Sequence, residues 1–227
     1  MTPRAIFISR SFDQIGNQLQ QFASNGGKLF AQSLLRFEGI KNENIPLSDV
    51  VFISSIRAAP FFFQDQGIPK VLYACAGKET ERKLLEQYQI ECAYVAEEAG
   101  NPSQAAVTFK EWLKERTVLF PSSEQSLLSY SSLIPTSQKT ERMVYRTLAN
   151  PVAIPPCDYY VFSSPSNVSA FLEVNQLPSN ARCIAWGKST EAALNSHQIP
   201  VYHCLTEGSV QELDAYLRTH VFQSMEL

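Results

Sequence analysis

Short apolar runs alternate with amphipathic stretches along the whole chain. The runs cover residues 6–8, 50–53, 71–73, 92–95, 118–120, 159–162, 183–186 and 201–204. Most are bounded by Ser, Gly or Pro, and their lengths suit strands buried in a parallel sheet. Helical spacing is found at Ile15, Leu19 and Phe22; Ala106, Phe109 and Leu113; Val168, Phe171 and Leu172; and Val210, Leu213 and Leu217. Strand, helix and strand in repetition predict an α/β fold with crossover helices.

The same order of segments occurs twice, at a spacing of about 110 residues, which is the mark of an internal repeat. Residues 49–55 (DVVFISS) resemble residues 158–164 (DYYVFSS), and residues 77–80 (GKET) resemble residues 187–190 (GKST). We therefore predict two related halves, each forming a doubly wound α/β unit.

Two serines also fit this repeat. Ser11 is followed by Gln14, and Ser122 is followed by Gln125, each just after an apolar run. A Ser followed three residues later by Gln is typical of a capping box. The pattern predicts a helix start at both places.

Two segments of mixed polarity do not fit either half. Residues 34–44 and 141–150 are bordered by Pro46, Pro135 and Pro151. We predict that they are strands outside the two sheets, paired as a two-stranded connector, so that one domain is inserted into the other. The expected divisions are a first domain of residues 1–33 and 151–227, an inserted domain of residues 46–138, and connector strands at 34–45 and 139–150.

The composition is that of an ordinary globular protein without a basic surplus. Among 227 residues, 44% are hydrophobic and 18% are charged, with 19 Lys and Arg against 22 Asp and Glu. Proteins that bind nucleic acid through its phosphates normally carry a basic excess, so we expect no nucleic-acid partner. The apolar runs are far shorter than the roughly 20 residues that span a bilayer, so we expect no membrane partner. Five cysteines without a close pair favour a reducing cytoplasm.

Hydroxyl side chains gather where predicted strands end and helices begin. Ligands of open α/β sheets bind at these junctions, and helix N-termini attract carboxylates and phosphates. Two domains facing each other across a cleft could therefore hold a large anionic ligand without many Lys or Arg residues. Ser and Thr are also preferred helix caps, so a purely structural role stays open for each residue. The junction residues include Ser54, Thr80, Ser122, Ser163, Ser164, Ser166, Thr190 and Thr206.

The two Gly-Lys-x-Thr segments are not P-loops. A P-loop requires a glycine five residues before its Gly-Lys pair, whereas Leu72 and Arg182 stand at those positions. A turn with a capped helix and a carboxylate-binding turn both remain open for these segments.

Tyr145 lies in the second connector segment. It would face a cleft between the domains if strand alternation directs it there, or it would pack on the connector. With only His197, His203 and His220 in the chain, no nucleophilic triad can be singled out.

Five segments in order resemble the uroporphyrinogen-III synthase family and extend over nearly the whole chain. They are residues 8–11 (ISRS), 144–147 (VYRT), 162–168 (FSSPSNV), 186–194 (WGKSTEAAL) and 206–210 (TEGSV). These resemble, respectively, the family's first strand ending in Thr-Arg-Pro, its connector tyrosine, its Phe-Thr-Ser-x-Asn-x-Val segment, its Ile-Gly-x-x-Thr-Ala-x-x-Leu turn and its last Thr-containing helix start. The chain departs from the family at residues 54–57, which lack the usual Asn, and at residues 121–123, which lack a frequent Arg-Gly.

The resemblance implies two similar doubly wound parallel-sheet domains joined by a two-stranded connector, with the active site in the cleft between them. Members of the family cyclise the linear tetrapyrrole hydroxymethylbilane to uroporphyrinogen III in haem biosynthesis. The last pyrrole ring is inverted, water is lost, and no cofactor or metal takes part. By resemblance we expect a cytoplasmic monomer of this type.

The resemblance also assigns roles to residues. Tyr145 becomes the candidate acid that assists departure of the hydroxyl, and Arg10 pairs with a substrate carboxylate. The residues expected to bind the remaining carboxylates are Ser54, Thr80, Ser122, Ser163, Ser164, Ser166, Thr190 and Thr206. A rival hypothesis from another class is a non-catalytic two-domain protein that binds an anionic small molecule, and a scaffold protein without a ligand is a third.

Overall fold

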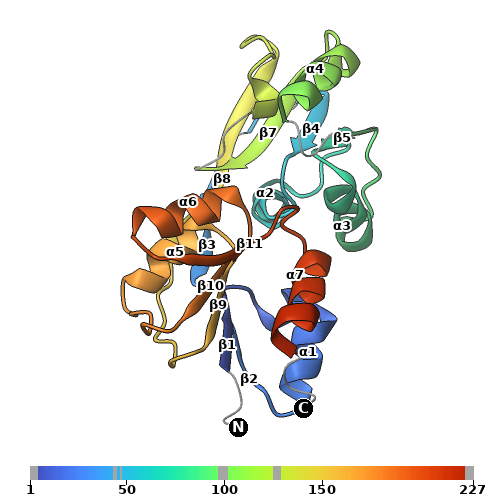
Figure 1. The fold of residues 1–227 in the computed structure, drawn as a ribbon. Coiled ribbons are helices and arrows are strands. Elements are labelled where there is room, and N and C mark those ends of the chain that lie inside the picture. Colours follow the sequence, from blue (N-terminus) through green and yellow to red (C-terminus); the bar gives the residue numbers. More distant parts are fainter. Residues whose placement is uncertain (1–4, 43–44, 47, 97–101, 125–128, 223–227) are drawn as a thin grey trace. The chain divides into compact units, whose positions relative to one another are not determined.

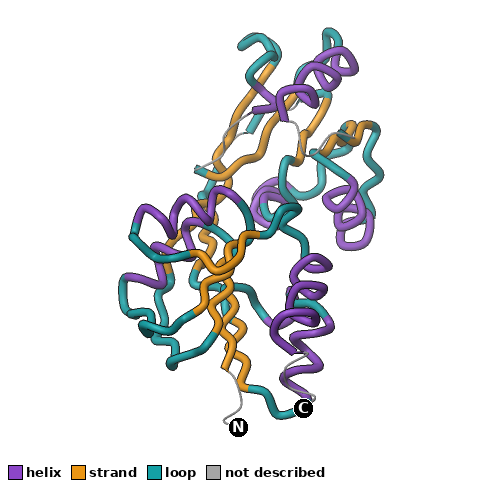
Figure 2. Tube along the Cα trace, in the orientation of Figure 1, coloured by secondary structure: helices purple, strands orange, loops and turns teal. Residues whose placement is uncertain are grey.

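The computed structural model describes residues 5–42, 45–46, 48–96, 102–124 and 129–222. The chain divides into two compact units, Met1–Arg36 with Leu148–Leu227, and Phe37–Thr147. Both units alternate strands with helices along the sequence, as Figures 1 and 2 show.

The first unit is built on a five-stranded sheet in the order β11-β10-β9-β1-β2, and all neighbouring strands are parallel. Its strands are β1 (Ala5–Ile8), β2 (Lys28–Ala31), β9 (Tyr159–Phe162), β10 (Arg182–Ala185) and β11 (Val201–Cys204). Its helices are α1 (Asn17–Ser24), α5 (Pro165–Leu172), α6 (Lys188–Ser196) and α7 (Val210–Leu217), with short turns η1 (Phe12–Gln14) and η3 (Arg218–Phe222).

The two faces of this sheet are covered by different helices. Phe7, Tyr160 and Phe162 form a buried cluster with residues of α5 and α6. Ile6 and Ile8, which alternate with Phe7 along β1, instead belong to a cluster that includes residues of α1 and α7. Alternation of side chains along each strand thus buries both faces, as a doubly wound sheet requires.

The second unit has a six-stranded sheet in the order β3-β8-β7-β4-β5-β6. Its strands are β3 (Leu35–Gly39), β4 (Val50–Ile53), β5 (Leu72–Cys75), β6 (Tyr94–Val95), β7 (Val118–Ser123) and β8 (Lys139–Ala149). Its helices are α2 (Ala58–Gln66), α3 (Lys78–Tyr88) and α4 (Pro102–Leu113), with the short turn η2 (Ser129–Ser131). Residues of α2 and α3 cluster with Val51 and Ile53, whereas residues of α4 cluster with Val50 and Phe52.

The prediction of an α/β fold with parallel sheets is confirmed, and every apolar run predicted as a strand forms one. The predicted helical stretches correspond to α1, α4, α5 and α7. Strand β2 and helix α2 were not predicted. Helix α2 carries Pro60 in its first turn, where proline is tolerated, and three consecutive phenylalanines that give no helical period.

The connector strands were predicted outside the sheets, and this was wrong. Strands β3 and β8 are neighbours, but β8 also pairs with β7 in parallel, so that both extend the second sheet. An isolated two-stranded ribbon would leave the backbone groups along both outer edges unpaired. Pairing with β7 gives β8 backbone partners on both sides.

The capping box predicted at Ser11 is not formed. Ser11 precedes the short turn η1 and makes no side-chain cap hydrogen bond. Ser122 lies within β7, where its Oγ donates to the carbonyl oxygen of Arg142 at 3.3 Å. Its expected partner Gln125 lies outside the described residues. A polar residue after an apolar run can thus still belong to the strand.

Helix α1 receives a carboxylate from a distant part of the chain at its N-terminus. Its N-cap residue is Gly16, which has no side chain to offer. Asp214 of α7 takes this place, since its Oδ2 accepts from the backbone N–H of Gln18 at 3.4 Å. A β-carbon added to Gly16 would lie 2.3 Å from both Asp214 oxygens. A side chain at this position would therefore force the Asp214 carboxylate to move.

We expect Gly16→Ala to lower the free energy of unfolding by about 1–3 kcal/mol, because the added methyl group displaces the Asp214 carboxylate. Urea denaturation measures the change. Gly187→Ala is the matched control, since a β-carbon there meets no atom within 4 Å and the φ of 174° is ordinary extended backbone. A Gly16→Ala cost that stays the same in an Asp214→Ala background would contradict the assigned cause.

Asp214 should also make stability depend on pH. Burial raises the pKa of its carboxyl group above the ordinary 3.8, although the N–H groups of Gln18 and Asn17 and the charge of Arg218 oppose this. A raised pKa favours the protonated folded form, so the group's contribution is complete below 3.8 and is lost as pH rises through the folded value. Asp214→Asn should therefore gain stability relative to the parent protein as pH rises through this window. A difference that does not vary with pH, measured by urea denaturation, would exclude this linkage.

Candidate active site

The predicted site residues of the first unit lie at one edge of its sheet. Strands β11, β10, β9 and β1 are parallel neighbours, so their carboxyl ends open at the same edge. Thr206 follows β11, Ser163 and Ser164 follow β9, and Arg10 follows β1 at this edge. Ser166 and Thr190 lie in the first turns of α5 and α6, which leave the same edge. Thr190 is only 2% exposed, so little of its side chain is open to a ligand.

Trp186 brings three loops of this edge together. The guanidinium carbon of Arg10 lies 4.1 Å from the centre of the Trp186 ring, a cation–π contact. Gly208, with φ +63°, passes so close that a β-carbon would lie 2.8 Å from the Trp186 carbonyl oxygen. The loops after β1, β10 and β11 therefore meet at one indole. Trp186 was not among the predicted site residues, although it opens the segment 186–194 that resembles the family, because that segment gives Trp186 no contact of its own.

The serine turn after β9 is tied to β1. The backbone N–H of Ser163 donates to Ser9 Oγ at 2.8 Å, and Ser163 Oγ donates to the Ser9 carbonyl oxygen at 2.8 Å. Ser164 is the N-cap of α5, and its Oγ accepts from the N–H of Asn167. Asn167 is buried, at 3% exposed. It belongs to the segment 162–168 that resembles the family, but no role was predicted for it from the sequence.

The backbone amides of the loop after β11 already hold a carboxylate in this structure. The N–H groups of Thr206, Glu207 and Gly208 donate to the carboxylate of Glu212 at 2.6, 2.9 and 3.0 Å. Burial opposes ionisation, yet these donors keep the pKa of Glu212 below its ordinary value. The N–H of Glu212 donates to Ser209 Oγ, which is half of the capping box that the Ser-x-x-Glu spacing predicts, while the Glu212 carboxylate binds the preceding loop. The Thr206 side chain itself is exposed.

The second unit places its predicted residues at the corresponding edge. Strands β7, β4 and β5 are neighbours, and β4 is parallel to both of the others. Ser54 follows β4, and Thr80 lies in the first turn of α3 after β5; both are half-buried. Ser122 lies within β7, is 5% exposed and lines a cavity of about 370 Å³ together with Ser123 and Arg142.

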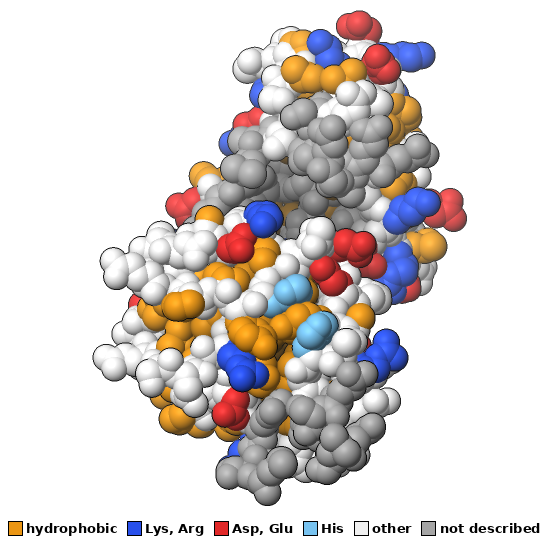
Figure 3. Space-filling model, in the orientation of Figure 1, with side chains coloured by type: hydrophobic (Ala, Val, Ile, Leu, Met, Phe, Trp, Pro, Cys, Tyr) orange, Lys and Arg blue, Asp and Glu red, His pale blue; other side chains and the backbone are white. Residues whose placement is uncertain are grey.

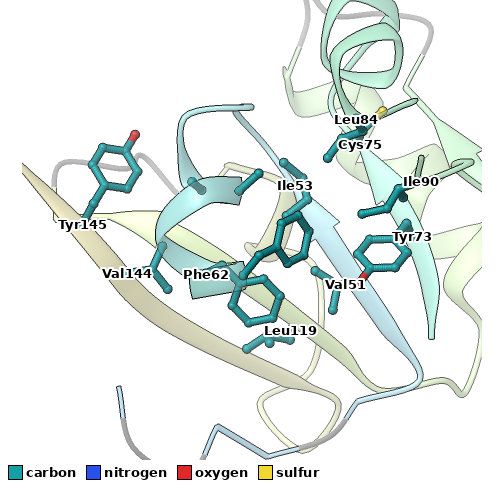
Figure 4. Close-up of a cluster of buried hydrophobic side chains, with 13 residues drawn as sticks. Val51, Ile53, Phe62, Tyr73, Cys75, Leu84, Ile90, Leu119, Val144 and Tyr145 are labelled. Carbon is teal, nitrogen blue, oxygen red and sulfur yellow. The ribbon is translucent and has the colours of Figure 1, made fainter. Parts of the chain in front are cut away.

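Tyr145 reaches the same edge from β8, where it is paired with Ser123. Its side chain is 5% exposed, and its ring stacks on Phe61 at 5.3 Å and meets the edge of Phe37 at 6.0 Å. Figure 4 shows its hydroxyl directed away from the labelled side chains of the buried cluster. Among the described residues, none forms a hydrogen bond with this hydroxyl. The ring is thus held by packing on Phe61 and Phe37 and not by a hydrogen bond of its hydroxyl.

A positive charge lies beside this aromatic stack. The guanidinium carbon of Arg57 is 4.3 Å from the centre of the Phe37 ring. In the sequence, Arg57 was noted only as one of residues 54–57, where the chain departs from the family. Its position beside Phe37, which contacts Tyr145, could not be inferred from spacing, because Phe37 comes from β3.

The charges on the surface are mixed. On the face drawn in Figure 3, Lys and Arg side chains are interspersed with Asp and Glu. In the part of the chain that the structure describes, no helix has both the length and the apolar character to cross a membrane. Within the same ranges, no three His, Cys, Asp or Glu side chains are grouped so that they could hold a metal ion.

A family model and several solved structures are similar to this chain. A family model described as Uroporphyrinogen-III synthase HemD matches residues 19–213. A search of curated proteins finds no match. The structure of uroporphyrinogen-III synthetase from Helicobacter pylori is similar, with a TM-score of 0.71 and 17% identity over 96% of this chain and 100% of that chain.

A mutant uroporphyrinogen III synthase from the extremely thermophilic bacterium Thermus thermophilus is also similar. Its TM-score is 0.52 at 11% identity, over 94% of this chain and 98% of that chain. At these identities the structural likeness establishes the fold, and membership rests on the family model, which extends over most of the sequence. The chain belongs to the uroporphyrinogen-III synthase family.

Proposed function

We propose that this protein is a uroporphyrinogen-III synthase, a lyase that cyclises hydroxymethylbilane with inversion of the last pyrrole ring and loss of water. The observation that carries the proposal is the family match over residues 19–213. The geometry supports it, because both units place hydroxyl-bearing turns at the carboxyl ends of their parallel strands.

The substrate carries many carboxylates, and the helix starts are suited to them. Helices α3 and α6 begin after Gly77 and Gly187, and neither has a side-chain cap hydrogen bond. Their first N–H groups can therefore donate to a ligand carboxylate, which the partial positive charge of the helix start also attracts. Thr80 and Thr190 lie in the first turns of these helices, and Arg10 adds a full positive charge at the edge of the first sheet. We assign the first N–H groups of both helices, the Thr80 hydroxyl and Arg10 to carboxylate binding, whereas the buried Thr190 side chain offers a ligand little surface.

Departure of the hydroxyl group needs little help from the protein. When the carbon–oxygen bond of the pyrrolic hydroxymethyl group breaks, the pyrrole nitrogen stabilises the cation that remains. The Tyr145 hydroxyl gives its proton to the departing oxygen, which leaves as water. The proton lost when the last ring forms its new carbon–carbon bond balances the one that Tyr145 supplied. The enzyme's main contribution is then orientation, which directs closure to the inverted carbon.

We also propose that the enzyme works in the cytoplasm as a monomer. All five cysteines, Cys75, Cys92, Cys157, Cys183 and Cys204, are free thiols, which suits a reducing compartment. Each unit has its own sheet and buried clusters, so neither depends on a second copy of the chain for a core.

The product isomer tests the activity. Purified protein added to freshly made hydroxymethylbilane should give uroporphyrinogen III, whereas spontaneous closure gives the type I isomer. Chromatography of the oxidised products separates the two. Unchanged formation of type I together with a thermal shift on adding uroporphyrinogen would identify a binding protein. Type I without any shift would favour a scaffold.

We expect Tyr145→Phe to lower kcat about 10²-fold, because it removes the proposed acid and keeps the stacked ring. Stability should change by less than about 0.5 kcal/mol, since the hydroxyl has no hydrogen-bond partner among the described residues. Tyr88→Phe is the matched control, because it removes a phenol hydroxyl from a ring packed on the same buried cluster. Unchanged turnover per folded molecule of Tyr145→Phe would make Tyr145 a packing residue.

A further inference from the structure

The Ser163 hydroxyl makes its hydrogen bonds within the protein. A serine hydroxyl has one hydrogen to donate and two lone pairs that accept. Ser163 Oγ lies 2.8 Å from the Ser9 carbonyl oxygen, to which it donates, and 3.1 Å from Ser9 Oγ. Ser9 is buried, and its own Oγ accepts from the Ser163 N–H. These contacts hold the end of β9 to the end of β1 and leave Ser163 no hydrogen for a ligand.

Asn167 has a fixed amide orientation. Its Oδ1 accepts from the backbone N–H of Leu34 at 2.9 Å, which identifies the other amide atom as the donor Nδ2. Nδ2 donates to Ser164 Oγ at 3.0 Å and to Ser163 Oγ at 3.3 Å. Since Asn167 is 3% exposed, both ends of its amide are satisfied by protein atoms. The side chain thus presents only N–H groups to the serine turn.

These contacts decide which way the Ser164 hydroxyl faces. Its Oγ receives two hydrogens, one from Nδ2 of Asn167 and one from the backbone N–H of Asn167 at 3.3 Å. Both lone pairs are then occupied, and no described residue accepts the remaining hydrogen. An ordinary N-cap serine needs only the backbone contact, so the second donation from Nδ2 goes beyond capping.

We propose that Asn167 is a positioning residue. Its donation to Ser164 Oγ leaves the Ser164 hydroxyl able only to donate, and this hydroxyl then binds a substrate carboxylate. Ser163 keeps the turn attached to β1. An ionised carboxylate only accepts hydrogen bonds, so it matches a hydroxyl whose lone pairs are both occupied. This inference rests on the proposed function, and it selects one of two adjacent serines that the sequence could not distinguish.

Three variants test the assignment by steady-state kinetics with hydroxymethylbilane. Ser164→Ala should raise KM about tenfold or more and change kcat less, because a hydrogen bond to a charged group is lost. Ser163→Ala should instead lower the melting temperature more than Ser164→Ala does, and should raise KM less. Ser169→Ala is the control on the same helix, since its exposed hydroxyl contacts only the carbonyl oxygen of Pro165.

Asn167→Asp separates positioning from folding. The new carboxylate can still accept from the Leu34 N–H, but it draws the Ser164 hydrogen towards itself. KM should rise about tenfold near pH 8 and fall back towards the parent value near pH 6, because a protonated, buried Asp again donates to Ser164. A merely structural loss would not recover with pH.

The Kd for uroporphyrinogen III, measured by fluorescence, should rank the variants in the same order as KM and needs no turnover. If the parent protein forms no type III isomer but binds this product, the proposed function is wrong. The Kd values of the serine variants still test the inference in that case. A Ser163→Ala effect on KM or Kd as large as that of Ser164→Ala would overturn the inference, as would an Asn167→Asp variant whose KM and Kd match the parent protein. Absence of both turnover and binding in the parent protein would overturn it together with the function.

Discussion

Parallel strand pairing is the constraint on which the architecture depends. Parallel neighbours need a crossover for every connection, and the crossover helices bury both faces of each sheet. With the faces covered, the open places for chemistry are the strand ends. All carboxyl ends of parallel strands lie at one edge, so residues such as Arg10, Ser164 and Thr206 are gathered there although they are far apart in the sequence.

Burial on two faces also explains how much the sequence could predict. Strands buried on both sides read as continuous apolar runs, and each of those runs is a strand. What failed was decided by tertiary contacts. Pairing of β8 with β7 depends on a register between distant segments, and Ser122 is a strand residue because that pairing continues past Phe120. The roles of Trp186 and Asn167 depend on neighbours that no local pattern specifies.

The chain satisfies some of its own helix starts with carboxylates and leaves others open. Asp214 serves α1, and Glu212 holds the loop that leads into α7. By contrast, α3 and α6 begin after glycines without a side-chain cap. The first unit thus binds two of its own carboxylates with backbone N–H groups, and the starts of α3 and α6 have N–H groups of the same kind without a side-chain cap. This division is what makes a polycarboxylate a fitting substrate.

The interrupted first unit has a consequence for synthesis of the chain. Its central strands β1 and β9 pair Ile6 with Tyr159, so its sheet cannot be completed until the whole second unit has been made. The second unit is continuous from Phe37 to Thr147 and can collect its contacts earlier. Closing so long a loop is slow compared with local pairing. During synthesis the second unit can therefore fold while β1 has no partner, because β9 has not yet been made.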